Sequence, residues 1–203
     1  MMKIIDNFLS KTYYNSILEI LSGNQFDWKY FDNITEPQPK ALEHFNGYGF
    51  SHIFWDEDRG SSNPLGPYME PLLYQIMDVA ECDLVLRARA DMVTWTKDEY
   101  IHPPHTDFPF LNTAAIFYVN ETDGDTIIYD VKPNEETILK LKELERVSPK
   151  PNRLVLFEGN ILHTGCSPTK HKNRILINSN YMKNEWRDTE EFKTLVKKKK
   201  MKS

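Results

Sequence analysis

The chain has 203 residues, of which 40% are hydrophobic and 12% aromatic, so it is long enough for one domain with a buried core. Its net charge of −5 argues against a general affinity for nucleic acid, and no apolar run reaches the roughly 18 residues of a membrane span. Two isolated cysteines, Cys82 and Cys166, and an N-terminus unlike a signal peptide favour the reducing cytoplasm. The basic segment VKKKKMKS is expected to be a solvated, frayed helix end.

The first part of the chain predicts helices and irregular structure. A helix is expected over 10–21, with Ser10 as its N-cap and Gly23 as its stop. Its apolar residues recur at helical spacing: Tyr14, Ile17, Leu18 and Leu21. Residues 24–66, rich in aromatics, glycine and proline, read as irregular, and a second helix is expected from about Pro67 to Cys82.

From Asp83 onward the pattern changes to short strands. The segment 83–95 alternates, which predicts one face with Leu84, Leu86, Ala88 and Ala90 and another with Val85, Arg87 and Arg89. Further strands are expected in TAAIFYVN, DGDTIIYD, RLVLFEG, ILHTGCS and RILINSNYM. A helical pattern returns over 188–200.

This order predicts a mainly β protein with flanking α-helices. We expect a double-stranded β-helix, that is, a jelly-roll or cupin-like barrel, buttressed by N-terminal helices. We also expect a single domain over 1–203. Within it, 1–82 would be a helical and loop support region, 83–182 the barrel core, and 183–203 a C-terminal helix and basic tail.

Three side chains form a candidate metal site. On an extended segment residues two apart share a face, so His105 and Asp107 of HPPHTDF can reach one ion together. His163 lies in a predicted strand between Gly159 and Gly165, and glycine permits the close backbone approach of a crowded pocket. Two neutral imidazoles and one carboxylate leave open positions on a divalent metal, as in non-haem Fe(II) oxygenases.

Arg174 follows His163 by eleven residues and opens a predicted apolar strand. A cation that enters a barrel interior needs an anionic partner, and a planar guanidinium suits a carboxylate. Arg174 therefore predicts a carboxylate-bearing cosubstrate beside the metal. Zinc in a hydrolase is the alternative for the three ligands. It gives Arg174 no role, and the sequence lacks a clear general base such as the glutamate of HExxH.

About half of the chain resembles the 2-oxoglutarate- and Fe(II)-dependent dioxygenases, in the prolyl-4-hydroxylase-like branch. The likeness rests on HTD, AIFYVNETDGDT and PNRLVLFEGNILHTGCSPTKHKNRILINSNY. It implies a double-stranded β-helix whose mouth holds iron on His105, Asp107 and His163. It also implies that Arg174 pairs with the C5 carboxylate of 2-oxoglutarate, and that Tyr118, which matches the tyrosine of a Tyr-Leu-Asn strand motif, reaches the same carboxylate.

The sequence also departs from the family. Its Gly-Gly-x-Thr turn is here the segment DGDT at 123–126, with one glycine missing. The collagen-type prolyl hydroxylases have lysine where this chain has Arg174, whereas the oxygen-sensing ones have arginine. The aromatic residues that hold a proline substrate are not matched. Asn178 lies at a period-2 position on the Arg174 strand, so we place it with the cosubstrate-binding residues.

We therefore predict a 2-oxoglutarate-dependent dioxygenase, an oxidoreductase that hydroxylates a substrate and releases succinate and carbon dioxide. Its cofactors would be Fe(II) and 2-oxoglutarate, with a role for ascorbate left open, and no catalytic residue beyond the metal ligands is expected. Its partners would be dioxygen and a peptide or small-molecule substrate, without a membrane or nucleic acid. The alternatives are a non-catalytic metal-binding jelly-roll module and a zinc-dependent hydrolase.

The sequence names neither the substrate nor the oligomeric state, and leaves open whether proline is the target. Three regions are candidate walls or lid of a substrate pocket: the aromatic stretch 45–55, the loop 105–112 and Trp186.

Overall fold

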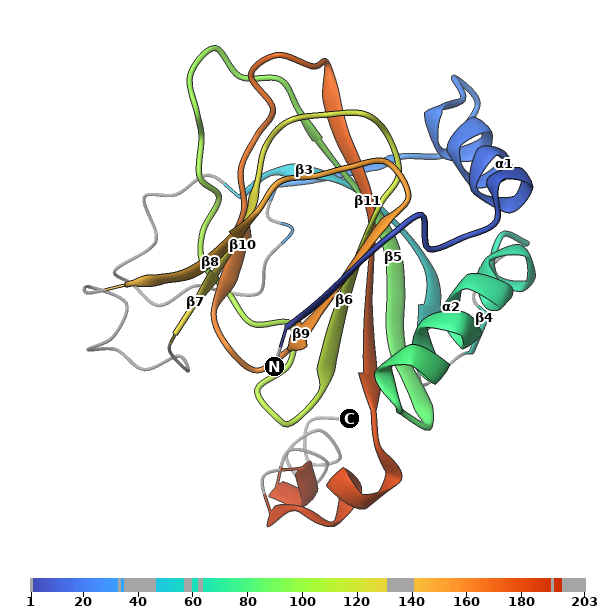
Figure 1. The fold of residues 1–203 in the computed structure, drawn as a ribbon, viewed down its shortest axis with the longest axis vertical. Helices are drawn as coiled ribbons and strands as arrows, with labels where there is room; N and C mark the ends of the chain where they lie inside the picture. The colour runs from blue at the N-terminus through green and yellow to red at the C-terminus, as the bar shows by residue number, and fades with distance from the viewer. Residues whose placement is uncertain are drawn as a thin grey trace.

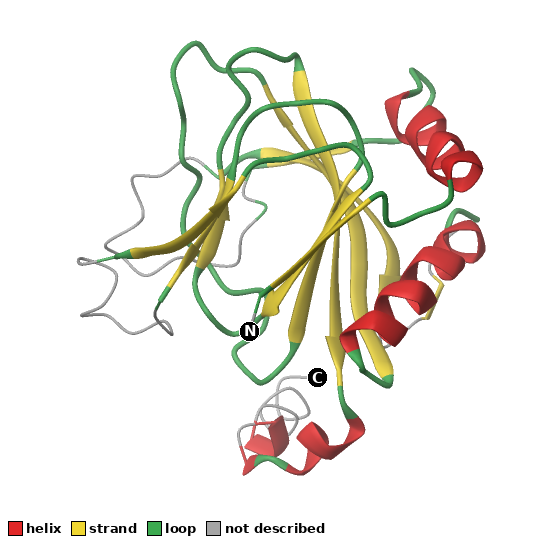
Figure 2. Ribbon diagram, in the orientation of Figure 1, coloured by secondary structure: helices red, strands yellow, loops and turns green. Residues whose placement is uncertain are grey.

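A computed structural model describes residues 2–32, 34, 47–56, 60–61, 64–130, 141–190 and 192–194. Within these ranges two antiparallel sheets face each other, and two helices lie against the outer face of the larger one (Figures 1 and 2). This is the double-stranded β-helix, or jelly roll, that the strand pattern predicts, so the predicted fold class is confirmed.

The larger sheet has eight strands among the described residues. From one edge to the other they are β1 (Lys3–Asp6), β9 (Arg153–Glu158), β6 (Thr113–Tyr118), β11 (Asn173–Met182), β5 (Leu84–Thr94), β3 (Gly49–Asp56) and β2 (Lys29–Phe31), with β4 (Gly60–Ser61) paired to β3. Strand β11 is flanked by β5 and β6 and is buried along almost its whole length. It is therefore the central strand on which the site is built.

The smaller sheet consists of β10 (His163–Gly165), β7 (Thr126–Tyr129) and β8 (Glu143–Val147). The segment before β6 also lies beside β10, through isolated bridges that join Ile101 to Cys166 and His105 to His163. Residues far apart in the sequence are thus brought to one edge of the smaller sheet.

The two predicted helices are present as α1 (Lys11–Ser22) and α2 (Gly66–Ala80). Their apolar faces pack on the outer face of the larger sheet and form the main core with residues that include Ile17, Leu21, Met69, Leu72, Leu73, Ile76, Ala88, Ala90, Ile175 and Ile177. Ser10 lies at the N-cap position but makes no side-chain capping bond. Because Ser10 is exposed, water can hydrogen-bond to the backbone amides of the first turn of α1.

The prediction of irregular structure over 24–66 was wrong in part, because β2, β3 and β4 lie in this range. Strand β3 has an irregular register between Ile53 and Trp55, so Phe54 is fully buried next to the exposed Ile53. A bulge of this kind removes the alternation by which a strand is read from sequence. Residues 44–46, 57–59 and 62–63 lie outside the described residues.

The predicted faces of β5 were also wrong for Leu84, Val85 and Leu86. The register against β11 passes from Arg87 directly to Val85, which makes Leu86 an extra residue. Val85 consequently packs in the main core with Ala88 and Ala90, whereas Leu86 packs with Phe110 and Met182 in a separate cluster. The face that carries Arg87 and Arg89 is the inner face of the barrel.

After β11 the chain forms a short 3₁₀ helix, η3 (Asn184–Asp188), and residues 192–194 are helical. The rest of the helix predicted over 188–200, and with it the basic tail, falls at 195–203, outside the described residues. Trp186 packs against the cluster of Leu86, Phe110 and Met182 rather than at the pocket described below. In the described parts of the chain no helix has both the length and the apolar character to cross a membrane.

Candidate metal and cosubstrate site

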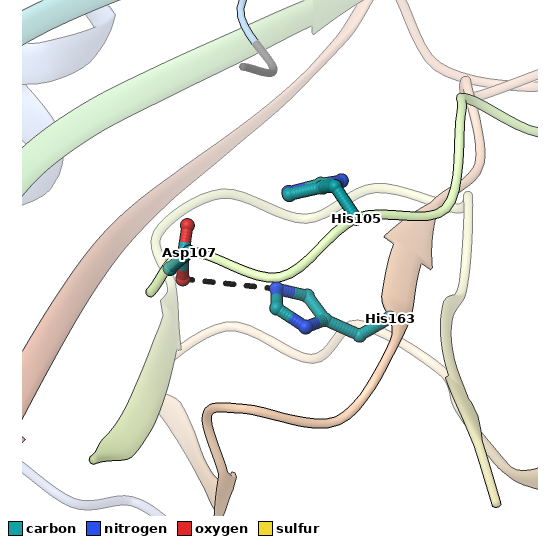
Figure 3. Close-up of side chains that lie close together, drawn as sticks. All are labelled: His105, Asp107 and His163. Carbon is teal, nitrogen blue, oxygen red and sulfur yellow. Dashed lines mark ion pairs between the residues drawn. The ribbon is translucent and has the colours of Figure 1, made fainter. Parts of the chain in front are cut away.

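The three predicted metal ligands meet between the two sheets, where their side chains point toward one another (Figure 3). His105 and His163 face each other across a backbone pair with two hydrogen bonds of 2.9 Å. One ligand atom from each of His105, Asp107 and His163 lies within 4.8 Å of the others, and no other such group occurs among the described residues. Two neighbouring atoms bound at about 2.1 Å to one face of an ion lie about 3 Å apart, so the three side chains would close around a bound metal.

Both imidazoles are held in the form that binds a metal. Nδ1 of His105 donates to the Pro103 carbonyl at 3.0 Å, and Nδ1 of His163 donates to the Ile161 carbonyl at 3.1 Å. In the neutral form of each ring the proton is therefore on Nδ1, and Nε2 is directed to the site. Burial, followed by the neighbouring His163, lowers the pKa of His105 to about 3, so His105 stays neutral at pH 7.

Asp107 is held as an anion by several donors. Arg87 Nη2 donates to its Oδ1 at 2.6 Å, and Asn180 Nδ2 donates to its Oδ2 at 3.0 Å. Burial alone would raise the pKa of Asp107, but the charge of Arg87 holds it well below its usual value. Oδ2 of Asp107 also lies 3.7 Å from Nε2 of His163, the contact marked by the dashed line in Figure 3.

Arg174 lies in the same pocket and is only 4% exposed. Its Nη2 donates to Thr126 Oγ1 at 2.7 Å, and its guanidinium lies 5.4 Å from the centre of the Tyr118 ring. Gly165 makes room for it, since a Cβ there would come within 2.9 Å of Arg174 Nη1. Nε of Arg174 is buried without a hydrogen-bond partner. A buried cation with an unused donor is suited to an anionic ligand.

The other two predicted cosubstrate residues lie apart, one behind Arg174 and one in the pocket wall. Tyr118 is fully buried beside Arg174, and its hydroxyl hydrogen-bonds to Thr126 Oγ1 at 2.7 Å. Asn178 lies at the metal end, where its amide donates to Asp107 at 3.3 Å. The structure thus brings all six predicted residues to one region, with Asn178 next to the metal ligands.

The pocket that holds the ligands has a cavity of about 70 Å³, and its walls include Arg89, Asp91, His102, Thr126 and Leu176. A larger cavity of about 240 Å³ adjoins it at Val93 and His102. We assign the chemistry to the smaller one, because the walls of the larger cavity include none of the three ligands and not Arg174. The larger cavity offers space beside the site.

The turn at 123–126 lacks the first glycine of the Gly-Gly-x-Thr motif, and the Asp123 side chain holds it in place instead. The Asp123 carboxylate accepts hydrogen bonds from the backbone amides of Thr169, Lys170 and His171, at 2.8 to 3.1 Å. Gly124, with φ of +95°, keeps the conformation that favours glycine. Asp123 therefore joins the turn before Thr126 to the turn before Arg174, the two residues that bond to each other.

Sequence reasoning missed the polar side chains that lie around the ligands. They are Arg87, Arg89 and Asp91 on β5 and Asn180 on β11, all directed into the barrel. One signal was available: a strand predicted as buried contains Asn178 and Asn180 two positions apart. Buried amides need partners, so this pattern indicates an internal hydrogen-bond network.

The fold and the side chains define a class: a double-stranded β-helix with a His–Asp–His group on one face and a buried arginine beside it. No family profile matches the sequence, and no curated protein matches it either. Solved structures do match.

Three of the matching structures cover most of this chain. A prolyl hydroxylase from Trichoplax adhaerens, solved with a peptide of the hypoxia-inducible-factor oxygen degradation domain, aligns over 92% of this chain and 85% of its own, with TM-score 0.58 and 16% identity. A 2OG-Fe(II) oxygenase family oxidoreductase from Burkholderia pseudomallei aligns over 89% and 84%, with TM-score 0.62 and 8% identity. HygX from Streptomyces hygroscopicus, solved with nickel and 2-oxoglutarate, aligns over 90% and 83%, with TM-score 0.56 and 11% identity.

At these identities the likeness concerns the fold. The chain has the double-stranded β-helix of the 2-oxoglutarate- and Fe(II)-dependent oxygenases, prolyl hydroxylases among them. The predicted resemblance is therefore confirmed at the level of the fold.

Proposed function

We propose that the protein is an Fe(II)- and 2-oxoglutarate-dependent dioxygenase that hydroxylates a peptide residue or a small molecule. One observation carries the proposal: three ligand atoms within 4.8 Å of one another share a pocket with a buried arginine whose Nε has no partner. A metal site alone would not need the arginine, and an arginine alone would not need the ligands. Two solved proteins of this fold, HygX and the epimerase SnoN, contain 2-oxoglutarate with nickel and iron respectively.

The side chains suit Fe(II). Nε2 of His105, Nε2 of His163 and one oxygen of Asp107 would hold the ion and leave its remaining positions open. The carbonyls of Pro103 and Ile161 fix both ring orientations, which raises the basicity of each ligand nitrogen.

The other end of the pocket suits 2-oxoglutarate. Arg174 would bind its distal carboxylate, with Thr126 and Tyr118 keeping the guanidinium in place. Thr126 accepts from Arg174 while bonded to the Tyr118 hydroxyl, so the cation is oriented before the cosubstrate arrives. When bound, the iron and 2-oxoglutarate supply the oxidation, in which dioxygen and 2-oxoglutarate yield succinate, carbon dioxide and a hydroxylated substrate. The protein would position the iron and 2-oxoglutarate and exclude most of the water from the pocket.

The solved proteins of this fold include one with a bound peptide and one with a bound nogalamycin-type small molecule. We propose dioxygen and one of these two substrate classes as partners, and the cytoplasm as the location. A role for ascorbate stays a prediction. The division of the chain into three regions of one domain stays a prediction as well.

The test compares three proteins: the unaltered chain, His163→Ala and Arg174→Ala. We expect the unaltered chain to bind Co(II) and to release succinate slowly from 2-oxoglutarate with Fe(II), dioxygen and no added substrate. His163→Ala should lose both metal binding and succinate release. Arg174→Ala should keep its metal affinity and bind 2-oxoglutarate at least about tenfold more weakly, because a charged hydrogen bond contributes roughly 1.5–3 kcal/mol.

Each alternative gives a different result in the same assays. A non-catalytic binding module would bind metal, need not bind 2-oxoglutarate, and would release no succinate. A zinc hydrolase would bind metal. Titration with 2-oxoglutarate would then show no difference between the unaltered protein and Arg174→Ala. Unchanged 2-oxoglutarate affinity in Arg174→Ala would contradict the role given to that residue.

A further inference from the structure

The two oxygens of the Asp107 carboxylate share the amide of Asn178, at 3.4 Å and 3.3 Å, but their shorter contacts differ. Oδ1 accepts from Arg87 Nη2 at 2.6 Å, one of the shortest ion pairs among the described residues. Oδ2 accepts from Asn180 Nδ2 at 3.0 Å and faces Nε2 of His163 at 3.7 Å. The Asp107 side chain is only 2% exposed, so water cannot easily replace these partners. The carboxylate is thus held with one oxygen on a cation and the other toward the histidine.

The sheet itself places the two donors. Arg87 on β5 and Asn180 on β11 are directly opposite in the antiparallel register, so their side chains share the inner face. Arg87 Nη2 also donates to Asn180 Oδ1 at 3.3 Å, which leaves Nδ2 of Asn180 directed at Asp107. Because the donors come from two paired strands, their positions follow from the backbone.

A second layer fixes Asn180. Its Nδ2 also donates to Asn112 Oδ1 at 3.2 Å, and Asn112 Nδ2 donates to the Phe110 carbonyl at 2.8 Å. Gly159 leaves the space for this amide, since a Cβ there would come within 2.0 Å of Asn112 Oδ1. The glycine predicted to allow close approach near the metal therefore serves the support of Asp107.

Arg87 has a further contact that limits its movement. Its guanidinium carbon lies 5.2 Å from the centre of the Phe108 ring, the residue next to Asp107. The Arg87 guanidinium is therefore held by Asp107, by Asn180 and by the ring of Phe108. Few rotamers satisfy all three contacts, so little freedom remains to be lost when a metal binds.

We propose that Arg87, supported by Asn180, is a positioning residue that holds Oδ1 of Asp107 and thereby presents Oδ2 to the metal. The proposal rests on the metal site of the proposed function. Two effects oppose each other here. The guanidinium repels a divalent cation, but without it the buried carboxylate would lose its shortest hydrogen bond and could turn away from the site. Outer partners of metal ligands typically contribute about 10–100-fold to affinity, so we expect positioning to outweigh repulsion.

The experiment measures the affinity of the full chain for Co(II) by calorimetry and records the visible absorption of bound Co(II), which reports ligand geometry. The variants are Arg87→Met, which removes the charge, and Arg87→Lys, which keeps it. Arg153→Met is the matched control. Arg153 also makes a 2.6 Å ion pair, with Asp6, and its side chain is also 20% exposed, but Asp6 is not one of the three metal ligands.

We expect Arg87→Met to bind Co(II) about 10–100-fold more weakly, with an altered spectrum. Arg87→Lys should lie between Arg87→Met and the unaltered protein, since lysine keeps a charged donor but loses the planar fork. Arg153→Met should keep both affinity and spectrum even if its melting temperature falls. Affinity in Arg87→Met that is unchanged or tighter overturns the proposal, and tighter binding would show that repulsion dominates.

Two further comparisons keep the outcomes distinct. If Arg87→Met fails to fold, Arg87→Lys and Asn180→Ala carry the test, and each should weaken Co(II) binding several-fold, while no weakening in either overturns the proposal. His163→Ala is measured in parallel. If it binds Co(II) as the unaltered protein does, the metal site and the proposed function fail together with the role of Arg87. If His163→Ala loses binding and Arg87→Met does not, only the role of Arg87 fails.

Discussion

Replacing Gly165 by alanine tests how closely the arginine of the cosubstrate pocket is held. The new Cβ would lie 2.9 Å from Arg174 Nη1, whereas ordinary contacts begin at 3.4 Å. The guanidinium must therefore move by about half an ångström. Its Nη2 is bonded to Thr126 Oγ1 at 2.7 Å, and the same displacement stretches that bond toward about 3.2 Å, the limit of good geometry.

The expected magnitude follows from this one bond. A hydrogen bond to a charged group contributes roughly 1.5–3 kcal/mol, and losing about half of it costs about 1–1.5 kcal/mol. This corresponds to roughly five- to tenfold weaker binding of 2-oxoglutarate. The assay is calorimetric titration of 2-oxoglutarate into the Co(II)-loaded protein. Co(II) affinity is measured separately and should stay unchanged, because the alanine methyl meets Arg174 rather than a metal ligand.

Two comparisons make the result decisive. Gly23→Ala is the control, since its Cβ would meet only backbone oxygens at the end of α1, at 3.1 Å and 3.3 Å. It should alter stability at most and leave 2-oxoglutarate binding unchanged. The second is 2-oxobutyrate, which has no distal carboxylate and should bind the Gly165→Ala and unaltered proteins equally. Equal affinity of both proteins for 2-oxoglutarate, or an equal loss for 2-oxobutyrate, would refute the reasoning.

Two further predictions concern stability. Asn152 has φ of +59°, and its side chain bonds both to the backbone amide and to the carbonyl of Leu9, at 2.8 Å and 2.9 Å. Asn152→Ala should lower the free energy of unfolding in urea by about 2–4 kcal/mol and Asn152→Gly by less, so a change below about 0.5 kcal/mol would contradict this account. The second prediction is pH dependence: burial lowers the pKa of His102 to about 4 and of His105 to about 3. Because unfolded histidine takes up a proton near pH 6.5, the metal-free protein should lose stability as the pH falls below about 6.5, with a shallower slope in His102→Gln; equal stability at pH 7.5 and 5 would count against it.

Much of the fold could be predicted because alternation and helical spacing survive where an element has one buried face. The helix at 11–22 is an example. Alternation failed at Leu86 and at Phe54, where a register irregularity moves a side chain to the other face. Such a bulge depends on pairing with a distant strand, and pairing cannot be read from a local pattern.

For the site, the metal ligands could be predicted from the sequence, but the contacts that hold them could not. The spacing of His105 and Asp107 is local, so a shared face follows from an extended backbone. Arg87 could not be assigned to Asp107 in advance, because that contact requires β5 and the loop after His105 to lie together. The position of Asn178 is intermediate: its face was predictable, but its bond to Asp107 rather than to the cosubstrate end was not.

The backbone pair between His105 and His163 has a consequence for how such a protein can change over time. Their spacing is set by two main-chain hydrogen bonds, which any side chains around them would leave in place. Substitutions in the pocket wall, at Ile116 or Leu176 for example, can then alter what fits beside the metal without moving these two ligands. If the proposed function holds, the arrangement separates the residues that hold the metal from the residues that select the substrate. A new preference could therefore arise by single substitutions in the wall while the metal stays bound throughout.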